Sequence, residues 1–246
     1  MEVSNEILDF LTGIHGRSEQ DNRKDKIFDR AFALAYKDMA THTVVYKYDA
    51  KEAFFGNNSK RCIDNKVKTR NAIKEYVVTE IFNDTAMQMF MRIDSQTEFD
   101  EWQKAACKAF SNIKYTVNGL ENKDSCIQTR SISELLCHTD KGIKCVFTTG
   151  QAQKLINMMV KYLYIFYQCE GRDDLERLKQ YAHVPIDSYV LKEVFGKETY
   201  NGTPWSKIES YETYQECEAK IIETAELDGF ESPFLWELAK WPFEKQ

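Results

Sequence analysis

The sequence predicts an all-α, mainly helical protein, and three observations support this fold class. Hydrophobic residues make up 43% of the 246 positions and aromatic residues 13%, which is enough apolar side chain for a packed core. Only 10 glycines and 4 prolines are present, too few for the many turns of a β-sandwich or barrel. Apolar residues also recur at helical spacing along most of the chain.

The N-terminal part is expected to hold two helical stretches on either side of one strand. Residues from 18 to 40 place apolar side chains on one helical face, and Ser18 is a plausible cap. Residues 43–48 are the best strand candidate, although no partner strand is evident from the sequence. Residues 66–92 alternate charged and apolar groups with a helical period, and residues 83–85 are expected to break this stretch into two helices.

The middle of the chain combines one helix with a long polar stretch. Thr97 is expected to cap a helix that carries Phe99 and Phe110. Residues 111–130 are polar and are expected to be irregular, and a short helix could follow over 131–136. If the fold has two lobes with a cleft between them, their boundary would lie in 111–130. A single interleaved helical domain over the whole of 1–246 is equally consistent with the sequence.

The C-terminal part is expected to be built around one buried helix. Residues from 151 to about 168 are apolar on most sides, and a helix that is apolar nearly all round is a central one. Further helices are expected at 172–182, 187–195, 210–227 and 233–240.

Charge is unevenly distributed along the chain, whose net charge is −6. Residues 51–165 carry 17 basic and 13 acidic side chains, whereas residues 166–246 carry 9 basic and 17 acidic ones. The net-basic region 51–165 is therefore the part expected to face a polyanion such as DNA, or a nucleoside. The alternative is that this asymmetry is ordinary for solvated surfaces.

The cysteines and the apolar runs indicate a cytoplasmic protein without a membrane span. The seven cysteines show no Cys-x-x-Cys spacing, so they are expected to be reduced core residues rather than ligands of zinc. The four histidines share no spacing typical of metal ligands, and no metal is expected. The longest apolar runs are far too short to cross a bilayer. The N-terminus lacks the order of a signal peptide.

Two short segments suggest chemistry. Gly150 precedes the predicted central helix, and a glycine there could turn the amides of the first helical turn toward an open surface that holds a phosphate. Lys154 lies one turn further on, and a lysine beside buried apolar groups can act as a neutral nucleophilic amine. Asp187 follows Pro185 at the expected start of a helix. Its carboxylate could activate the amine or stabilise positive charge on a sugar ring.

These segments resemble the helix-hairpin-helix DNA glycosylases. That family carries a hairpin of the form Leu-Pro-Gly-x-Gly-x-Lys, a helix, and then a Val-Asp-Thr-His-Val-like segment with an essential aspartate. Residues 148–154 line up with the hairpin, and residues 184–191 with the aspartate segment. Lys154 would match the Schiff-base lysine of the bifunctional members and Asp187 the aspartate. Their long separation is most similar to that of the archaeal 8-oxoguanine glycosylases. The resemblance implies an α-helical fold, a flipped-out base and cleavage of its N-glycosidic bond.

The chain also departs from the family pattern. Thr149 stands where the hairpin proline is usual, and Ala152 stands where the second glycine is usual. No four-cysteine iron–sulfur motif follows, so no cofactor is expected. Considered without the family, Lys154 could be a plain helix lysine, and Asp187 an ordinary helix cap. A capping aspartate can still face a cleft, so the two interpretations of Asp187 are compatible.

Several residues are candidates to contact a substrate. His183 lies four positions before Asp187 and could line the same cleft, or it could be a histidine bonded to a nearby helix end. Tyr189 and Trp205 are the aromatic residues expected near a base-binding pocket. The start of the central helix supplies the remaining candidates, Gly150, Gln151 and Ala152.

A second class of function is open from the sequence. The chain could be a non-catalytic helical binding protein of bacterial or phage origin. The acidic region 166–246 and the Trp-rich end, with Leu235, Trp236 and Trp241, favour this alternative. The apolar end either locks the last helix onto the domain or contacts a protein partner.

Overall fold

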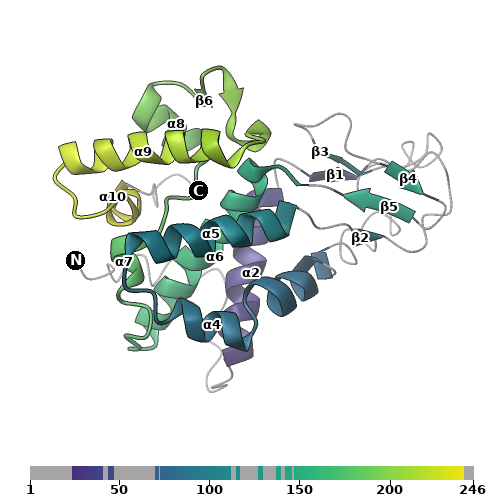
Figure 1. Ribbon diagram of the computed structural model, residues 1–246, viewed down its shortest axis with the longest axis horizontal. Coiled ribbons are helices and arrows are strands. Elements are labelled where there is room, and N and C mark those ends of the chain that lie inside the picture. The colour runs from purple at the N-terminus through teal and green to yellow at the C-terminus, as the bar shows by residue number, and fades with distance from the viewer. Residues whose placement is uncertain are drawn as a thin grey trace.

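The structure is a computed structural model that describes residues 24–40, 44–46, 70–71, 73–111, 115–116, 127–129, 137–139, 142–145 and 147–240. Within these ranges the protein is mostly helical, and its strands are two to four residues long. The predicted mainly helical class is therefore confirmed (Figure 1).

The central element is α6 (Thr149–Cys169), which is buried at every position from Thr149 to Tyr167. A capping box begins the helix: the Thr148 hydroxyl accepts from the Gln151 amide, and the Gln151 side chain accepts from the Thr148 amide. The buried central helix predicted from the sequence is confirmed. It begins two residues earlier than expected because Thr148, and not Gly150, ends the preceding turn.

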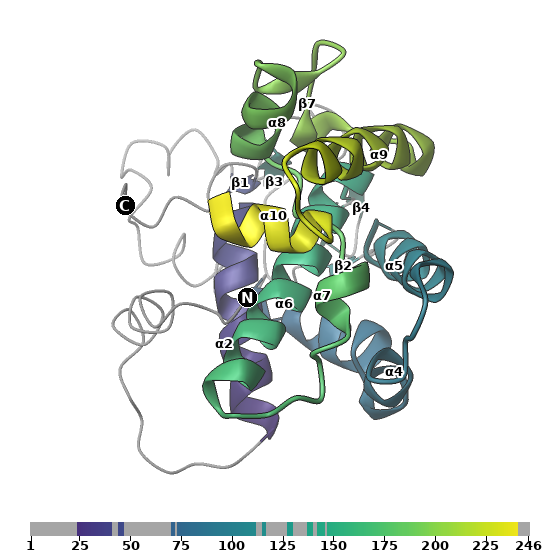
Figure 2. The same ribbon diagram turned by 90° about the vertical axis from the view of Figure 1, so that its left-hand side faces the viewer.

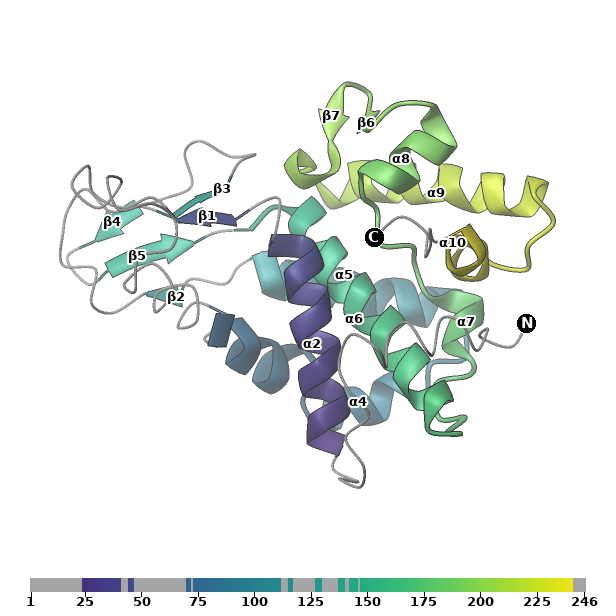
Figure 3. The same cartoon turned by 180° about the vertical axis from the view of Figure 1, so that it is seen from behind.

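Helices surround α6, and two of them lie on opposite sides of it (Figures 2 and 3). Two long helices, α2 (Lys24–Ala40) and α5 (Gln96–Ser111), pack against it. Residues 73–76 continue into the π-helix η2 (Val77–Ile81), and α4 (Asp84–Phe90) follows. The Asn83 side chain caps α4 by accepting from the Ala86 amide, so the predicted break at 83–85 is confirmed.

The predicted cap of α5 is wrong by two residues. Helix α5 begins at Gln96, and the Ser95 hydroxyl accepts from the Glu98 amide. Thr97 therefore lies inside the helix. Ser and Thr are both good caps, so the local sequence does not separate the two positions.

The C-terminal elements form a second layer, in which α8 and α9 lie at the top of the view, above α6 (Figures 1 and 3). They are α7 (Leu178–Tyr181), α8 (Ser188–Phe195), the β6–β7 hairpin (Thr199–Tyr200 and Thr203–Pro204), η3 (Trp205–Lys207), α9 (Tyr211–Leu227) and α10 (Pro233–Lys240). The last three predicted helices match α8, α9 and α10. The helix expected over 172–182 is wrong for its first part, because residues 172–173 are irregular, residues 174–177 form a turn, and only α7 is helical.

Buried apolar side chains form two clusters. The larger one joins α2, α4, α5, α6 and α7, and its members include Phe32, Phe99 and Met159. The smaller one joins α8, α9 and η3, and its members include Leu191 and Ile221. The extended segment 182–187 connects the layers, because Ala182 belongs to the larger cluster, and Val184 and Ile186 to the smaller one.

One expectation about strands is confirmed and another is wrong. The strand expected over 43–48 is present as β1 (Val44–Tyr46), and its partner, in an antiparallel pair, is β3 (Ile127–Thr129). Residues 111–130 are not wholly irregular, since they contain β3 and β2 (Tyr115–Thr116). Strand β2 belongs to a sheet with order β2-β5-β4, in which β5 is Gly142–Cys145 and β4 is Cys137–Thr139. Pairing between segments so far apart leaves no local signal.

These strands lie beside the helical body, away from α10 (Figures 1 and 3). The helix expected over 131–136 lies outside the described residues. The described element that precedes α6 is the strand β5.

Candidate functional site

Lys154 and Asp187 form a direct ion pair. Lys154 Nζ lies 2.7 Å from Asp187 Oδ2, although the two residues come from α6 and from the start of α8. The Lys154 side chain is 6% exposed and that of Asp187 29%. The other oxygen, Oδ1, accepts from the Val190 amide and caps α8. Asp187 is thus both a helix cap and the partner of the lysine.

The surroundings of Asp187 keep it ionised. Burial by itself would raise the pKa of this carboxyl group. The Lys154 ammonium, its hydrogen bond, the Val190 amide and the charge of Lys161 more than offset burial, so the pKa of Asp187 lies below its ordinary value. Asp187 is therefore a carboxylate at neutral pH.

A second buried ion pair lies two turns further along α6. Lys161 Nζ is 2.7 Å from Glu237 Oε1 on α10, and the two side chains are 0% and 8% exposed. Burial lowers the pKa of Lys161 to about 8, although Glu237 and Asp187 favour its charged form. Sequence reasoning missed this pair. The available signal was a second lysine seven positions after Lys154 on an otherwise apolar helix.

The first turn of α6 is covered by residues 205–209. The Gly150 amide donates to the Ile208 carbonyl at 2.8 Å. The hydroxyls of Thr148 and Thr149 donate to the carbonyls of Ser206 and Glu209. This segment lies so close that a Cβ atom on Gly150 would be 1.8 Å from the Trp205 carbonyl oxygen.

The expectation that the first amides of α6 face an open surface is therefore wrong. The amides of Gly150, Gln151 and Ala152 all have partners inside the protein, in Ile208 and Thr148. These amides cannot cradle a phosphate in this arrangement. Glycine is needed at position 150 because another backbone segment approaches closely there, and not because the chain turns.

His183 belongs to a buried polar network. It is 5% exposed, its Nδ1 is 2.7 Å from the Tyr214 hydroxyl, and its Nε2 is 2.8 Å from Oδ1 of Asp100, the fifth residue of α5. Burial raises the pKa of Asp100, but hydrogen bonds from His183 and Gln96 outweigh burial and lower it overall. His183 therefore bonds near a helix end. This was the alternative to lining the cleft.

Tyr189 and Trp205 lie in different settings. Tyr189 is 36% exposed, two positions after Asp187, and its hydroxyl donates to the Lys240 carbonyl. Trp205 is 8% exposed and belongs to the smaller core cluster. Tyr189 therefore has an accessible ring near the ion pair, whereas the Trp205 ring is part of the core.

The Trp-rich end packs inward where the structure describes it. Leu235 and Trp236 on α10 are buried, and the Trp236 indole donates to Asp228. They lock α10 onto the protein, which was one of the two expectations. Trp241 lies outside the described residues.

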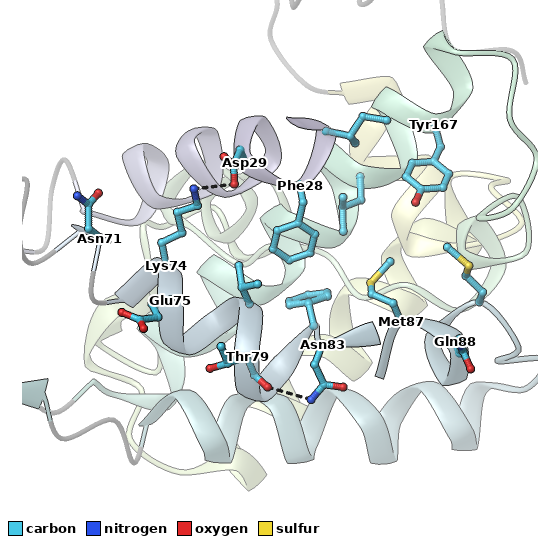
Figure 4. Close-up of a pocket in the computed structure, with 15 residues that line it drawn as sticks. Phe28, Asp29, Asn71, Lys74, Glu75, Thr79, Asn83, Met87, Gln88 and Tyr167 are labelled. Carbon is cyan, nitrogen blue, oxygen red and sulfur yellow. Dashed lines mark hydrogen bonds and ion pairs between the residues drawn. The ribbon is translucent and has the colours of Figure 1, made fainter. Parts of the chain in front are cut away.

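A groove of about 940 Å³ lies elsewhere, between α2, residues 71–83, α4 and the C-terminal half of α6 (Figure 4). Its lining includes Phe28, Phe82 and Tyr167, and the ion pair of Lys74 with Asp29 lies at one end. Neither Lys154 nor Asp187 lines this groove.

Searches for metal sites, membrane-spanning helices and related proteins gave no indication of function. Within the described ranges, no three His, Cys, Asp or Glu side chains gather in a way that could hold a metal ion. Among the described helices, none combines the length and the apolar character needed to span a membrane. The chain matches no protein-family model, and no curated protein or solved structure is measurably similar to it.

Proposed function

We propose that this protein is a DNA glycosylase of the helix-hairpin-helix type, which cleaves the N-glycosidic bond of a modified base. Lys154 is the amine nucleophile and Asp187 the carboxylate that assists it. One observation carries the proposal: a lysine and an aspartate from segments that resemble the family's two site segments lie 2.7 Å apart. Asp187 is the more exposed of the two, so a flipped-out nucleotide would approach from its side.

The chemistry requires Lys154 to lose one proton. The free lone pair on Nζ then forms a bond to C1′ of the nucleotide, while the bond from C1′ to the base breaks. The base leaves with that electron pair and takes up a proton. The C1′–O4′ bond then breaks, its electron pair goes to O4′, and O4′ takes up one of the two protons on Nζ. The lone pair freed on Nζ forms the C=N bond, which gives a protonated Schiff base between Lys154 and the sugar. Because the pKa of Asp187 lies below its ordinary value, its main role is to stabilise positive charge on the sugar and the amine.

The partner of the site is proposed to be DNA. Lys154 belongs to the net-basic region 51–165, and a basic surface attracts the phosphate backbone without regard to sequence. Binding through this region would fall with rising salt concentration, as expected when lysine and arginine displace cations from phosphates.

Borohydride trapping tests the proposal. The full-length protein is incubated with duplex oligonucleotides that each carry one modified base, and borohydride reduces any Schiff base to a stable covalent adduct. We expect an adduct with at least one lesion and its loss in Lys154→Gln. The matched control is Lys220→Gln, because Lys220 is an exposed lysine on α9 and its removal should leave the adduct unchanged.

Asp187→Asn separates the charge of Asp187 from its capping role. Asparagine is as good a helix cap as aspartate, so the fold should be kept while trapping slows by about 10²-fold or more. If neither adduct nor base release appears across the lesion panel, or if Lys154→Gln still forms the adduct, the proposed function is wrong.

A non-catalytic helical binding protein is the second candidate. The bonded first turn of α6 favours it, because these amides are occupied by residues 205–209. In that case the ion pair of Lys154 and Asp187 only joins α6 to α8. The same lesion panel would then give no adduct, and Asp187→Asn would change stability alone.

A further inference from the structure

We propose that Gln153 is a positioning residue that holds Asp187 against Lys154. This inference rests on the proposed function, because it concerns the same two side chains. Gln153 is the neighbour of Lys154 in the chain, and it bonds to Ile186, which is the neighbour of Asp187. One carboxamide therefore joins the two segments beside the ion pair.

The contact between Gln153 and Ile186 is bidentate. Gln153 Nε2 donates to the Ile186 carbonyl at 2.8 Å, and the Ile186 amide donates to Gln153 Oε1 at 3.0 Å. The side chain thus pairs with both polar groups of one residue, as a neighbouring β-strand would. Two bonds to one residue fix the orientation of its backbone as well as its distance. The backbone that leads into Asp187 is consequently held in one position relative to α6.

Two more buried side chains hold the same extended segment further from Asp187. The Asn157 side chain donates to the Val184 carbonyl at 3.0 Å, and the Val184 amide donates to Glu218 Oε1 at 3.0 Å. The side chains of Gln153 and Asn157 have no exposed surface. Buried backbone groups need partners, and here side chains supply them in place of a strand.

Removing the Gln153 amide would leave the two polar groups of Ile186 buried without a partner. The segment could recover hydrogen bonds only by moving away from α6, and Asp187 would move with it. A displacement of about 1 Å at a catalytic group can reduce a rate by roughly 10²-fold. Gln153 touches no part of the ion pair itself, so its effect acts through the position of Asp187.

The test compares Gln153→Met with Gln103→Met. Gln103 is a matched control because it is equally buried and belongs to the same network. It bonds to Asn157, Tyr214 and Tyr211 instead of residues 184–187. Both variants lose one buried carboxamide, and both should melt at a lower temperature than the wild type. Only Gln153→Met should disturb Asp187.

Two measurements follow Asp187 in the folded variants. The first is the rate of single-turnover trapping with the best lesion duplex, which should fall by about 10²-fold in Gln153→Met while DNA affinity is kept. The second is a carbon NMR titration of the Asp187 carboxyl group. We expect its pKa to rise toward the ordinary value in Gln153→Met because the Lys154 ammonium is no longer beside it. Gln103→Met should match the wild type in both measurements.

The outcomes separate the two proposals. If no protein gives an adduct but the pKa of Asp187 rises in Gln153→Met alone, the positioning role stands and the proposed function fails. If the titration and the trapping rate of Gln153→Met equal those of Gln103→Met, the positioning role is overturned. Should Gln153→Met not fold, Gln153→Asn takes its place, since it keeps a carboxamide that is one methylene too short to reach both groups of Ile186.

Discussion

Gly150→Ala is expected to destabilise the protein, although alanine is the better helix former. Gly150 lies in the first turn of α6, and in most helices this change would stabilise by about 1 kcal/mol. Here the new Cβ atom would lie 1.8 Å from the Trp205 carbonyl oxygen, whereas real Cβ atoms stay beyond 3.0 Å. That neighbour is backbone, so residues 205–209 must move away from α6.

The size of the effect follows from the contacts that this movement breaks. The first turn of α6 and residues 205–209 share three hydrogen bonds, made by the Gly150 amide and by the hydroxyls of Thr148 and Thr149. Each contributes about 1 kcal/mol, and overpacking adds about 1–3 kcal/mol. After the helix-propensity gain is subtracted, we expect a net loss of about 3–5 kcal/mol.

Urea denaturation followed by circular dichroism measures this loss. The matched control is Gly171→Ala, because Gly171 has φ of 66° and no atom within 4 Å of the added Cβ. In this control only backbone strain lowers the free energy of unfolding, by about 1–2 kcal/mol. The unfolding midpoint of Gly150→Ala should be the lower of the two. If Gly150→Ala is as stable as the wild type, the close approach of Trp205 does not exist.

Two further predictions concern buried charges. Lys161→Met should lower the free energy of unfolding by about 3–5 kcal/mol, because Glu237 would be left buried without its lysine. Adding Glu237→Leu should recover most of that loss in urea denaturation, and a single variant as stable as the wild type would contradict the ion pair. Burial raises the pKa of Glu218 to about 7, although His183 and the Val184 amide oppose this shift. Because the folded pKa is above the unfolded one, the stability that proton binding contributes is present below about pH 4.5 and is lost as the pH rises through about 7. Relative to Glu218→Gln, the wild type should lose roughly 3 kcal/mol across this window, and parallel stability curves for the two proteins would refute the shift.

Local patterns were sufficient for most of the helical elements. The apolar character of residues 151–168 predicted the buried helix α6, since a segment without a polar face has no side for solvent. The break at residues 83–85 was also predicted, because Asn83 has the side chain that a helix start needs. A helix boundary was harder to place where two nearby residues can both act as caps, as Ser95 and Thr97 can.

The role of Gly150 was not predictable from the local sequence. A glycine at a helix start is usually explained by backbone freedom. Here the reason is the carbonyl of Trp205, a residue 55 positions away whose approach no local pattern reports. The same limit applies to strand β1, whose partner β3 comes from a stretch that looks irregular.

In the candidate site, too, some features follow from the local sequence and others only from tertiary packing. The sequence by itself determined the buried helix that carries Lys154 and the cap at Asp187, because helix burial and capping depend on residues within a few turns. Only the tertiary structure decided that the two side chains meet at 2.7 Å, that Lys161 pairs with Glu237, and that Gln153 holds Ile186. These contacts join residues that lie from 33 to 76 positions apart in the chain. Such contacts depend on how whole helices and extended segments pack, which single-sequence patterns do not contain.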